Sequence, residues 1–275
     1  MKKLLFIVTI IILAFGLAAC SENAEDVYTK ALEAAGNMES AEVSMRLNQE
    51  ISMVKEGKVV IDSDMTGSMI IDPVAMHQKG TMSMTMEGEG FGAGMPIEMD
   101  TEIYYVDNEM YIFESMTEQW IKADSSFLPI DTLTANQPDV SEQLKMLEKY
   151  VEDFDFEEND NSFVYQLSAD GEGFKKLSQE MLDDYLPEDL TAQMGDFSQV
   201  MEDMEIKKLY IEMVIDNETF ELKNYKLDME MSMIVEGETV EIVQNVNSKY
   251  SNINTIDKIE VPQEVIDSAV DGTGF

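Results

Sequence analysis

Methionine is the residue type with the most chemical potential in this chain, and its spacing is regular. The sequence has 23 methionines among 275 residues. The segments 82–86 and 229–233 each place a methionine at every second position. Side chains two residues apart in a strand lie on the same face, about 7 Å from each other. This spacing therefore predicts two strands that each present a methionine-lined face.

Three interpretations of these methionines remain open. Methionine fills irregular gaps, so the side chains can simply pack the covered face of a sheet. A methionine-rich wall also re-packs around different shapes, which suits a pocket for a variable apolar ligand. Thioethers are soft ligands that select Cu(I), but a third thioether could reach the same ion only through a bulge. The first two interpretations are compatible with each other.

Enzyme chemistry has little support in the sequence. His77 is the only histidine and Cys20 the only cysteine, so Ser–His and Cys–His arrangements are nearly excluded. Acidic pairs are expected by chance among 56 acidic residues. The glycine-rich stretch 88–94 lacks the Lys-Ser/Thr ending of a phosphate-binding loop. We predict that the protein is not an enzyme, with no catalytic residues, no cofactor and no dedicated metal site.

Cys20 stands at the end of a secretory signal. Lys2 and Lys3 precede an apolar run over 4–17, and small residues follow it, as in a cleaved signal peptide. A cysteine directly after Leu17-Ala18-Ala19 resembles the lipobox of bacterial lipoproteins. The alternatives are a cleaved signal with an incidental cysteine and a single-pass anchor. The apolar run is short for a membrane-spanning helix, which needs about 20 residues.

The lipoprotein resemblance implies how the chain is processed and where it lies. Residues 1–19 are then the signal peptide, and residues 20–23 are the lipidated Cys20 and a short tether. The thiol of Cys20 receives a diacylglycerol with acyl chains such as palmitate. The protein is therefore expected at the cell membrane, lipid-anchored, on the extracytoplasmic side. Its membrane contact is through the lipid on Cys20, and its partner proteins are not identified.

The net charge limits the partners of the mature chain. Removal of residues 1–19 takes away two lysines and no acidic residue, so the formal net charge changes from −38 to −40. Nucleic acid and anionic headgroups are poor partners for such a surface. The chain still has 44% hydrophobic residues in regular patterns, which favours a packed core over disorder.

Hydrophobic periodicity predicts an α+β fold with long antiparallel strands. An amphipathic helix is expected first, followed by a meander of strands whose residues alternate apolar and polar. Val43, Met45, Leu47, Gln49, Ile51 and Met53 share one face of the first strand. Helices are predicted at 24–36, 138–151, 171–185, 188–202 and 262–269, and strands at 41–53, 59–71, 76–86, 97–106, 110–114, 120–122, 152–158, 162–168, 209–215, 220–235 and 240–250.

Two segments carry a family resemblance. They are the hairpin from Glu109-Met110-Tyr111-Ile112 to Trp120-Ile121-Lys122 and the strand Leu209-Tyr210-Ile211-Glu212-Met213-Val214-Ile215-Asp216. With the lipobox, they resemble the LolA/LolB/LppX-like lipoprotein fold, closest to an uncharacterised Gram-positive lipoprotein family. The resemblance implies a curved, open half-barrel sheet wrapped around helices, with an apolar cavity that accommodates acyl chains in relatives. Residues 24–275 then form a single carrier-like domain with a helical insert near 138–202.

These observations lead to one functional hypothesis and one alternative. The hypothesis is an anchored extracytoplasmic binding protein that holds or transfers a hydrophobic or amphiphilic ligand, namely a lipid or a lipidated molecule. The alternative is a non-enzymatic cell-surface interaction or assembly module with a filled core. Trp120 and nearby tyrosines either pack in the core or form the mouth of the cavity. The candidate cavity residues are Met45, Met53, Met69, Met82, Met84, Met86, Trp120, Met229, Met231 and Met233.

Overall fold

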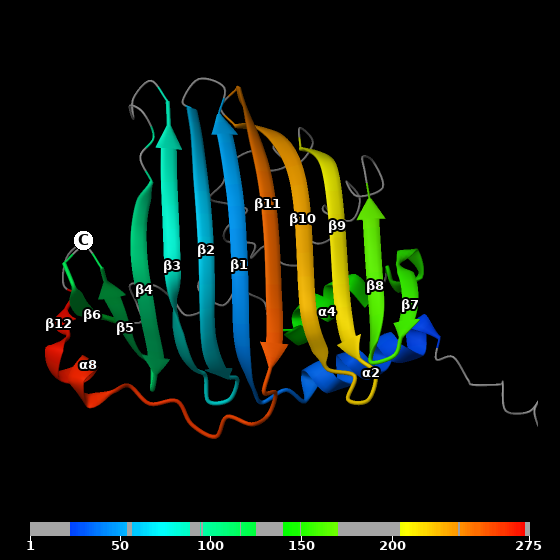
Figure 1. Ribbon diagram of the computed structural model, residues 1–275, viewed down its shortest axis with the longest axis horizontal. Helices are drawn as coiled ribbons and strands as arrows, with labels where there is room; N and C mark the ends of the chain where they lie inside the picture. The colour runs from blue at the N-terminus through cyan, green and yellow to red at the C-terminus, as the bar shows by residue number, and fades with distance from the viewer. Residues whose placement is uncertain are drawn as a thin grey trace, which may run out of the picture.

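A single large sheet dominates the computed structural model. The structure describes residues 23–53, 57–88, 94, 96–115, 117–124, 140–148, 150–169, 204–235 and 237–272. Twelve strands pair in the order β12-β6-β5-β4-β3-β2-β1-β11-β10-β9-β8-β7 (Figure 1). The strands are β1 Ser40–Met53, β2 Gly57–Ile70, β3 Ala75–Glu87, β4 Ile97–Val106, β5 Glu109–Glu114, β6 Gln119–Asp124, β7 Asp155–Asn159, β8 Ser162–Ala169, β9 Glu205–Asp216, β10 Leu222–Val235, β11 Glu238–Ser251 and β12 Val270–Asp271.

Three α-helices and one 3-10 turn accompany the sheet in the described residues. They are α2 Ala24–Gly36, α4 Val140–Glu148, α8 Gln263–Ser268 and the 3-10 turn Val151–Asp153. The helices predicted at 24–36, 138–151 and 262–269 are thereby found, the second and third somewhat shorter than expected. The helices predicted at 171–185 and 188–202, the signal segment 1–19 and Cys20 lie outside the described residues.

The centre of the sheet joins the two ends of the chain. β1 pairs antiparallel with β11 from Glu42 opposite Ser251 to Met53 opposite Val240. On one side β2 to β6 follow β1 as successive hairpins, and on the other side β10 to β7 follow β11. The sheet is curved and open, so the predicted α+β class with a half-barrel antiparallel sheet is confirmed. The two-residue pairing of β12 with β6 is parallel, unlike the rest.

The main core lies between one wing of the sheet and the helices α2 and α4. α2 begins after Asn23, whose side chain accepts a hydrogen bond from the backbone N–H of Asp26 at 2.8 Å and so caps the helix. Its buried face includes Val27, Tyr28 and Ala31. These side chains belong to one cluster with residues of α4, β8 and β9, such as Leu144. Burial of this amphipathic face is what holds α2 on the sheet.

A smaller cluster lies at the other end of the sheet and includes the C-terminal helix. Val265 of α8 packs with Tyr104 of β4 and Tyr111 of β5, and Trp120 lies against them. The chain from β11 to α8 runs along the lower ends of β1 to β4 (Figure 1). It is held there by Asn254, whose side-chain Oδ1 accepts a hydrogen bond from the backbone N–H of Glu39 at 2.6 Å. The C-terminal segment therefore connects the centre of the sheet to its β6 edge.

Candidate functional site

Strand register gathers the predicted methionines on one face of the sheet. Residues directly opposite each other in an antiparallel pair point to the same side. Met53 of β1 lies opposite Val240 of β11, and Val240 lies opposite Met233 of β10. We call this side the methionine face. It consists of every second residue, counted from the first, of 43–53 in β1, 59–69 in β2, 76–86 in β3, 97–105 in β4, 225–233 in β10 and 240–250 in β11.

Nine of the ten predicted site residues lie on the methionine face. They come from β1, β2, β3 and β10, which are neighbours in the sheet together with β11. All nine are half-buried, in contrast to the fully buried Met213 and Met110 of the core. The nine are Met45, Met53, Met69, Met82, Met84, Met86, Met229, Met231 and Met233.

The methionine face carries no charge. None of the residues that define it is Asp, Glu, Lys, Arg or His, although charged residues make up 27% of the chain. The alternate residues of the same strands point to the opposite side, the polar face, which includes Arg46, Asp62 and Asp228. The two faces of one sheet therefore have opposite character, and the uncharged one suits an apolar ligand.

The core covers only part of the methionine face among the described residues. Met69, Met229 and Met231 pack against the cluster that contains α2 and α4. Tyr225 and Tyr250 also lie on this part of the face, where burial raises the pKa of both phenols, that of Tyr250 to about 12. The other six candidate methionines belong to none of the buried clusters in the part of the chain that the structure describes.

One polar pair interrupts the methionine face. Gln49 of β1 lies directly opposite Gln244 of β11, and Gln49 Nε2 donates a hydrogen bond to Gln244 Oε1 at 3.4 Å. Met229 of β10 flanks the pair on one side and Ile61 of β2 on the other. The alternation in the sequence places Gln49 on this face. Nothing in the sequence signals that Gln244 meets it, because strand pairing over 195 residues is not written in a local pattern.

Trp120 lies on the opposite side of the sheet from the nine methionines. It is opposite Phe113 of β5, with ring centroids 5.4 Å apart, and lies 5.7 Å from the ring of Tyr104. His77 stacks on Tyr104 at 4.2 Å and its Nε2 is 2.8 Å from Glu102 Oε1. The structure therefore places Trp120 in the packed cluster under α8, the first of the two roles considered for it.

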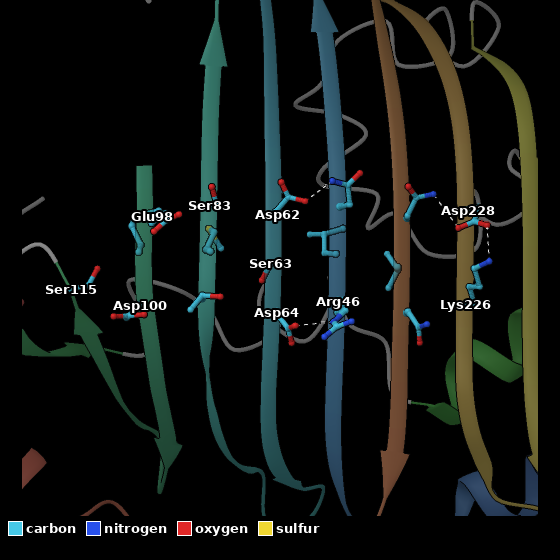
Figure 2. Close-up of a pocket in the computed structure, with 18 residues that line it drawn as sticks. Arg46, Asp62, Ser63, Asp64, Ser83, Glu98, Asp100, Ser115, Lys226 and Asp228 are labelled. Atoms are coloured by element: carbon cyan, nitrogen blue, oxygen red, sulfur yellow. Dashed lines mark hydrogen bonds and ion pairs between the residues drawn. The ribbon is translucent and has the colours of Figure 1, made fainter. Parts of the chain in front are cut away.

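A pocket of about 800 Å³ lies on the polar face, over the middle of the sheet (Figure 2). Arg46 Nε donates to Asp64 Oδ2 at 2.8 Å, and Lys226 Nζ lies 3.1 Å from Asp228 Oδ2. Asn48 donates to Asp62 at 2.5 Å. The dashed lines in Figure 2 show that many charged and amide groups of this pocket bind one another. Such pairs satisfy the groups within the protein and do not require a ligand.

Two further kinds of site were sought in the described residues. Within these residues, no three His, Cys, Asp or Glu side chains are grouped as they would be around a metal ion. None of the described helices has the length and apolar character needed to cross a membrane.

The sequence matches one protein family over most of its length. The model of the family described as "Family of unknown function (DUF6612)" matches residues 23–270. The chain belongs to this family. The match begins at the end of the predicted tether and ends in β12, so it spans the whole sheet. No curated protein matches the sequence significantly.

Several solved structures are similar to this chain, all at low sequence identity. A DUF1329 family protein from Desulfovibrio piger is 9% identical, with a TM-score of 0.23 over 87% of this chain and 96% of that one. A LolA superfamily protein from Nitrosomonas europaea is 10% identical, with a TM-score of 0.19 over 89% and 97%. A domain assigned to outer membrane lipoprotein sorting, from Vibrio parahaemolyticus, is 8% identical, with a TM-score of 0.23 over 86% and 95%. Likeness at this level does not assign a function to DUF6612 proteins.

Proposed function

We propose that this DUF6612 protein is a lipid-anchored extracytoplasmic binding protein that holds or transfers a hydrophobic or amphiphilic ligand. The ligand is a lipid or a lipidated molecule, and it lies against the methionine face. The observation that supports this most is the complete lack of charge on a half-buried face that carries nine candidate methionines. A protein with a formal net charge of −38 has no need to keep so large a surface uncharged unless an apolar group covers it.

The mechanism is burial of apolar ligand surface without a covalent step. Burial contributes about 25 cal/mol per Å², so an acyl chain that loses roughly 300 Å² gains about 7 kcal/mol before the costs of association. Flexible thioether side chains adjust to chains of different length and branching. The methionines on β10, β1 and β3 therefore provide a wall that accepts more than one ligand shape.

The alternative is an interaction module with a filled core, and one observation favours it. The side chains of Tyr28, Leu144 and Tyr165 already fill the space between α2, α4 and β8. If the whole methionine face were packed in this way, no lipid would bind. The half-buried state of Met45, Met82 and Met84, outside the buried clusters, favours the binding protein.

Native mass spectrometry tests this proposal. Residues 21–275 are purified from cells without detergent, and any bound molecule is then extracted with organic solvent. We expect a stoichiometric additional mass that extracts as lipid. A bare mass, together with no uptake of added lipid, would instead support the interaction module.

A matched pair of variants locates the ligand on the sheet. Met84→Glu places a charge on the methionine face, whereas Thr85→Glu places the same charge on the polar face, one residue further along β3. We expect Met84→Glu to weaken lipid binding at least ten-fold and Thr85→Glu to leave it unchanged. Equal effects of the two variants would contradict binding on the methionine face.

The anchor is tested separately from the ligand. In the lipoprotein interpretation, Cys20→Ala removes the only thiol in the chain and therefore the acceptor of the lipid. The variant is expected to lose incorporation of a palmitate analogue and to leave the membrane fraction. Labelling of the variant at the level of the original protein would exclude Cys20 as the modified residue.

A further inference from the structure

The Gln49–Gln244 pair is the feature of the methionine face that burial of an acyl chain does not explain. The two side chains meet in the middle of the face, in a row with Met229 and Ile61. A glutamine amide has two N–H donors and a carbonyl with two lone pairs. The single bond between the two amides uses one donor and one lone pair. Both side chains are half-buried, so the remaining donors and acceptors are accessible to a ligand on this face.

The second observation concerns which charges are absent near this pair. No lysine, arginine or histidine is among the residues of the methionine face, so a ligand anion that entered it would meet no counter-charge. Transfer of an unpaired carboxylate or phosphate from water to an apolar surface is strongly unfavourable. The formal net charge of −38 also repels an approaching anion. An uncharged amide or ester meets neither obstacle and can bond to the two glutamines.

We propose that Gln49 and Gln244 determine ligand specificity by binding an uncharged hydrogen-bonding group, so that the methionine face accepts acyl amides and esters and rejects free acyl anions. This inference rests on the proposed function and adds the chemical class of the ligand to it. The acyl chain extends over the methionines on both sides of the pair. A charged part of the same ligand, where present, remains in the solvent outside the face.

Three ligands of equal chain length test the inference. Palmitamide, palmitate and hexadecane, delivered from cyclodextrin at pH 8, compete with a fluorescent palmitoyl amide for residues 21–275. The wild-type protein is expected to bind palmitamide at least ten-fold more tightly than palmitate or hexadecane. In Gln49→Leu/Gln244→Leu, palmitamide should bind at least ten-fold more weakly than in the wild type, while hexadecane binds as well or better.

Two further variants make the result specific to these side chains. Gln49→Arg introduces a cation and is expected to reverse the preference, so that palmitate binds more tightly than palmitamide. Thr85→Leu on the polar face serves as the control and should change none of the three affinities. Circular dichroism confirms that each variant retains its strands.

The outcomes separate this inference from the function on which it rests. Palmitate that binds the wild type as tightly as palmitamide would overturn the inference while leaving a lipid-binding protein. An unchanged affinity of the double leucine variant for palmitamide would do the same. Failure of all three ligands to bind the wild type would overturn the proposed function and the inference together.

Discussion

At the scale of single residues, two tyrosine hydroxyls fasten α2 to the rest of the core. Tyr28 donates a hydrogen bond to the backbone carbonyl of Leu144 at 2.6 Å, which links α2 to α4. Tyr165 of β8 donates to the backbone carbonyl of Ala24 at 2.5 Å. The two rings meet edge to face with centroids 5.6 Å apart. Both hydroxyls are therefore satisfied in a position that excludes water.

Tyr28→Phe tests the hydroxyl that links the two helices. The change removes the donor and leaves the ring, so the free energy of unfolding is expected to fall by about 1–2 kcal/mol. Urea unfolding followed by circular dichroism measures it. Tyr210→Phe is the control, because its hydroxyl bonds to Glu212 on the polar face, where water can replace it. An equal loss in the two variants would contradict a special role of the α2–α4 contact.

Burial of tyrosines also sets the stability of the protein at high pH. The phenols of Tyr225 and Tyr250 have raised pKa values because burial disfavours the ionised form, and the pKa of Tyr250 rises from its ordinary value of 10.0 to about 12. Above pH 10 the unfolded chain loses these protons while the folded chain keeps them. Stability is therefore complete below pH 10 and falls as the pH rises toward 12, by about 1.4 kcal/mol per pH unit for each such tyrosine.

Urea midpoints between pH 8 and pH 11 measure this dependence. Tyr225→Phe/Tyr250→Phe removes two of the ionisable groups and is expected to flatten the decline. If the slope of the double variant equals that of the original protein, these two phenols do not titrate as proposed.

At the scale of elements, α8 is a short helix that depends on a single apolar contact. α8 has six residues, too few to be stable alone. Val265 is 4% exposed and packs on Tyr104 and Tyr111, next to the partly buried Trp120. Since Trp120 is the only tryptophan in the chain, its fluorescence reports whether α8 is in place.

Val265→Asp is expected to release α8 from the sheet. An unpaired carboxylate cannot remain in the cluster, so Trp120 becomes exposed to water and its emission shifts to longer wavelength. The methionine face lies on the other side of the sheet, and lipid binding should be unchanged. Ile266→Asp, at a position that is 41% exposed, is the matched control and should leave the emission as it is. A shift in both variants, or in neither, would contradict the docking of α8 through Val265.

Much of the secondary structure could be predicted from the sequence, because alternation of apolar and polar residues is a local property. The turn at Asp107 and Asn108 follows the same logic, since both residues have positive φ and such residues favour a tight hairpin. The long strand predicted from residue 220 begins instead at Leu222, because Phe220 has φ of 60° and belongs to the turn. β12 was missed, since two paired residues have no pattern of their own.

The candidate site was predicted only in part for a related reason. Period two groups the methionines of one strand, and hairpins carry the grouping to adjacent strands. The sequence does not show that β1 lies beside β11, on which the Gln49–Gln244 contact depends. The aromatic residues of the β5–β6 hairpin alternate as regularly as the methionines, so composition alone could not assign Trp120 to the opposite face.

At the scale of the whole molecule, the sheet separates charge from apolar surface. Its methionine face is uncharged, while its polar face contains acidic residues with few partners. Ion pairs such as Arg46–Asp64 join side chains that are 78% and 47% exposed, so they contribute little to stability. With 56 acidic and 18 basic residues, repulsion between carboxylates is the larger electrostatic effect in the folded chain.

Sodium chloride is therefore expected to stabilise the protein. Raising the salt from about 0.05 M to about 1 M shortens the screening length to about 3 Å, which removes most of the repulsion between exposed carboxylates. We expect the melting temperature to rise by about 2–4 °C or more, as follows from a gain of about 1 kcal/mol in a chain of this size. Chloride is preferable to sulfate here, because sulfate also strengthens apolar burial and would confound the two effects. A melting temperature that falls with sodium chloride would show that the surface ion pairs outweigh the repulsion. In that case the acidic polar face would be held together by its own charges, and the pocket over Arg46 and Asp64 would be a structural network.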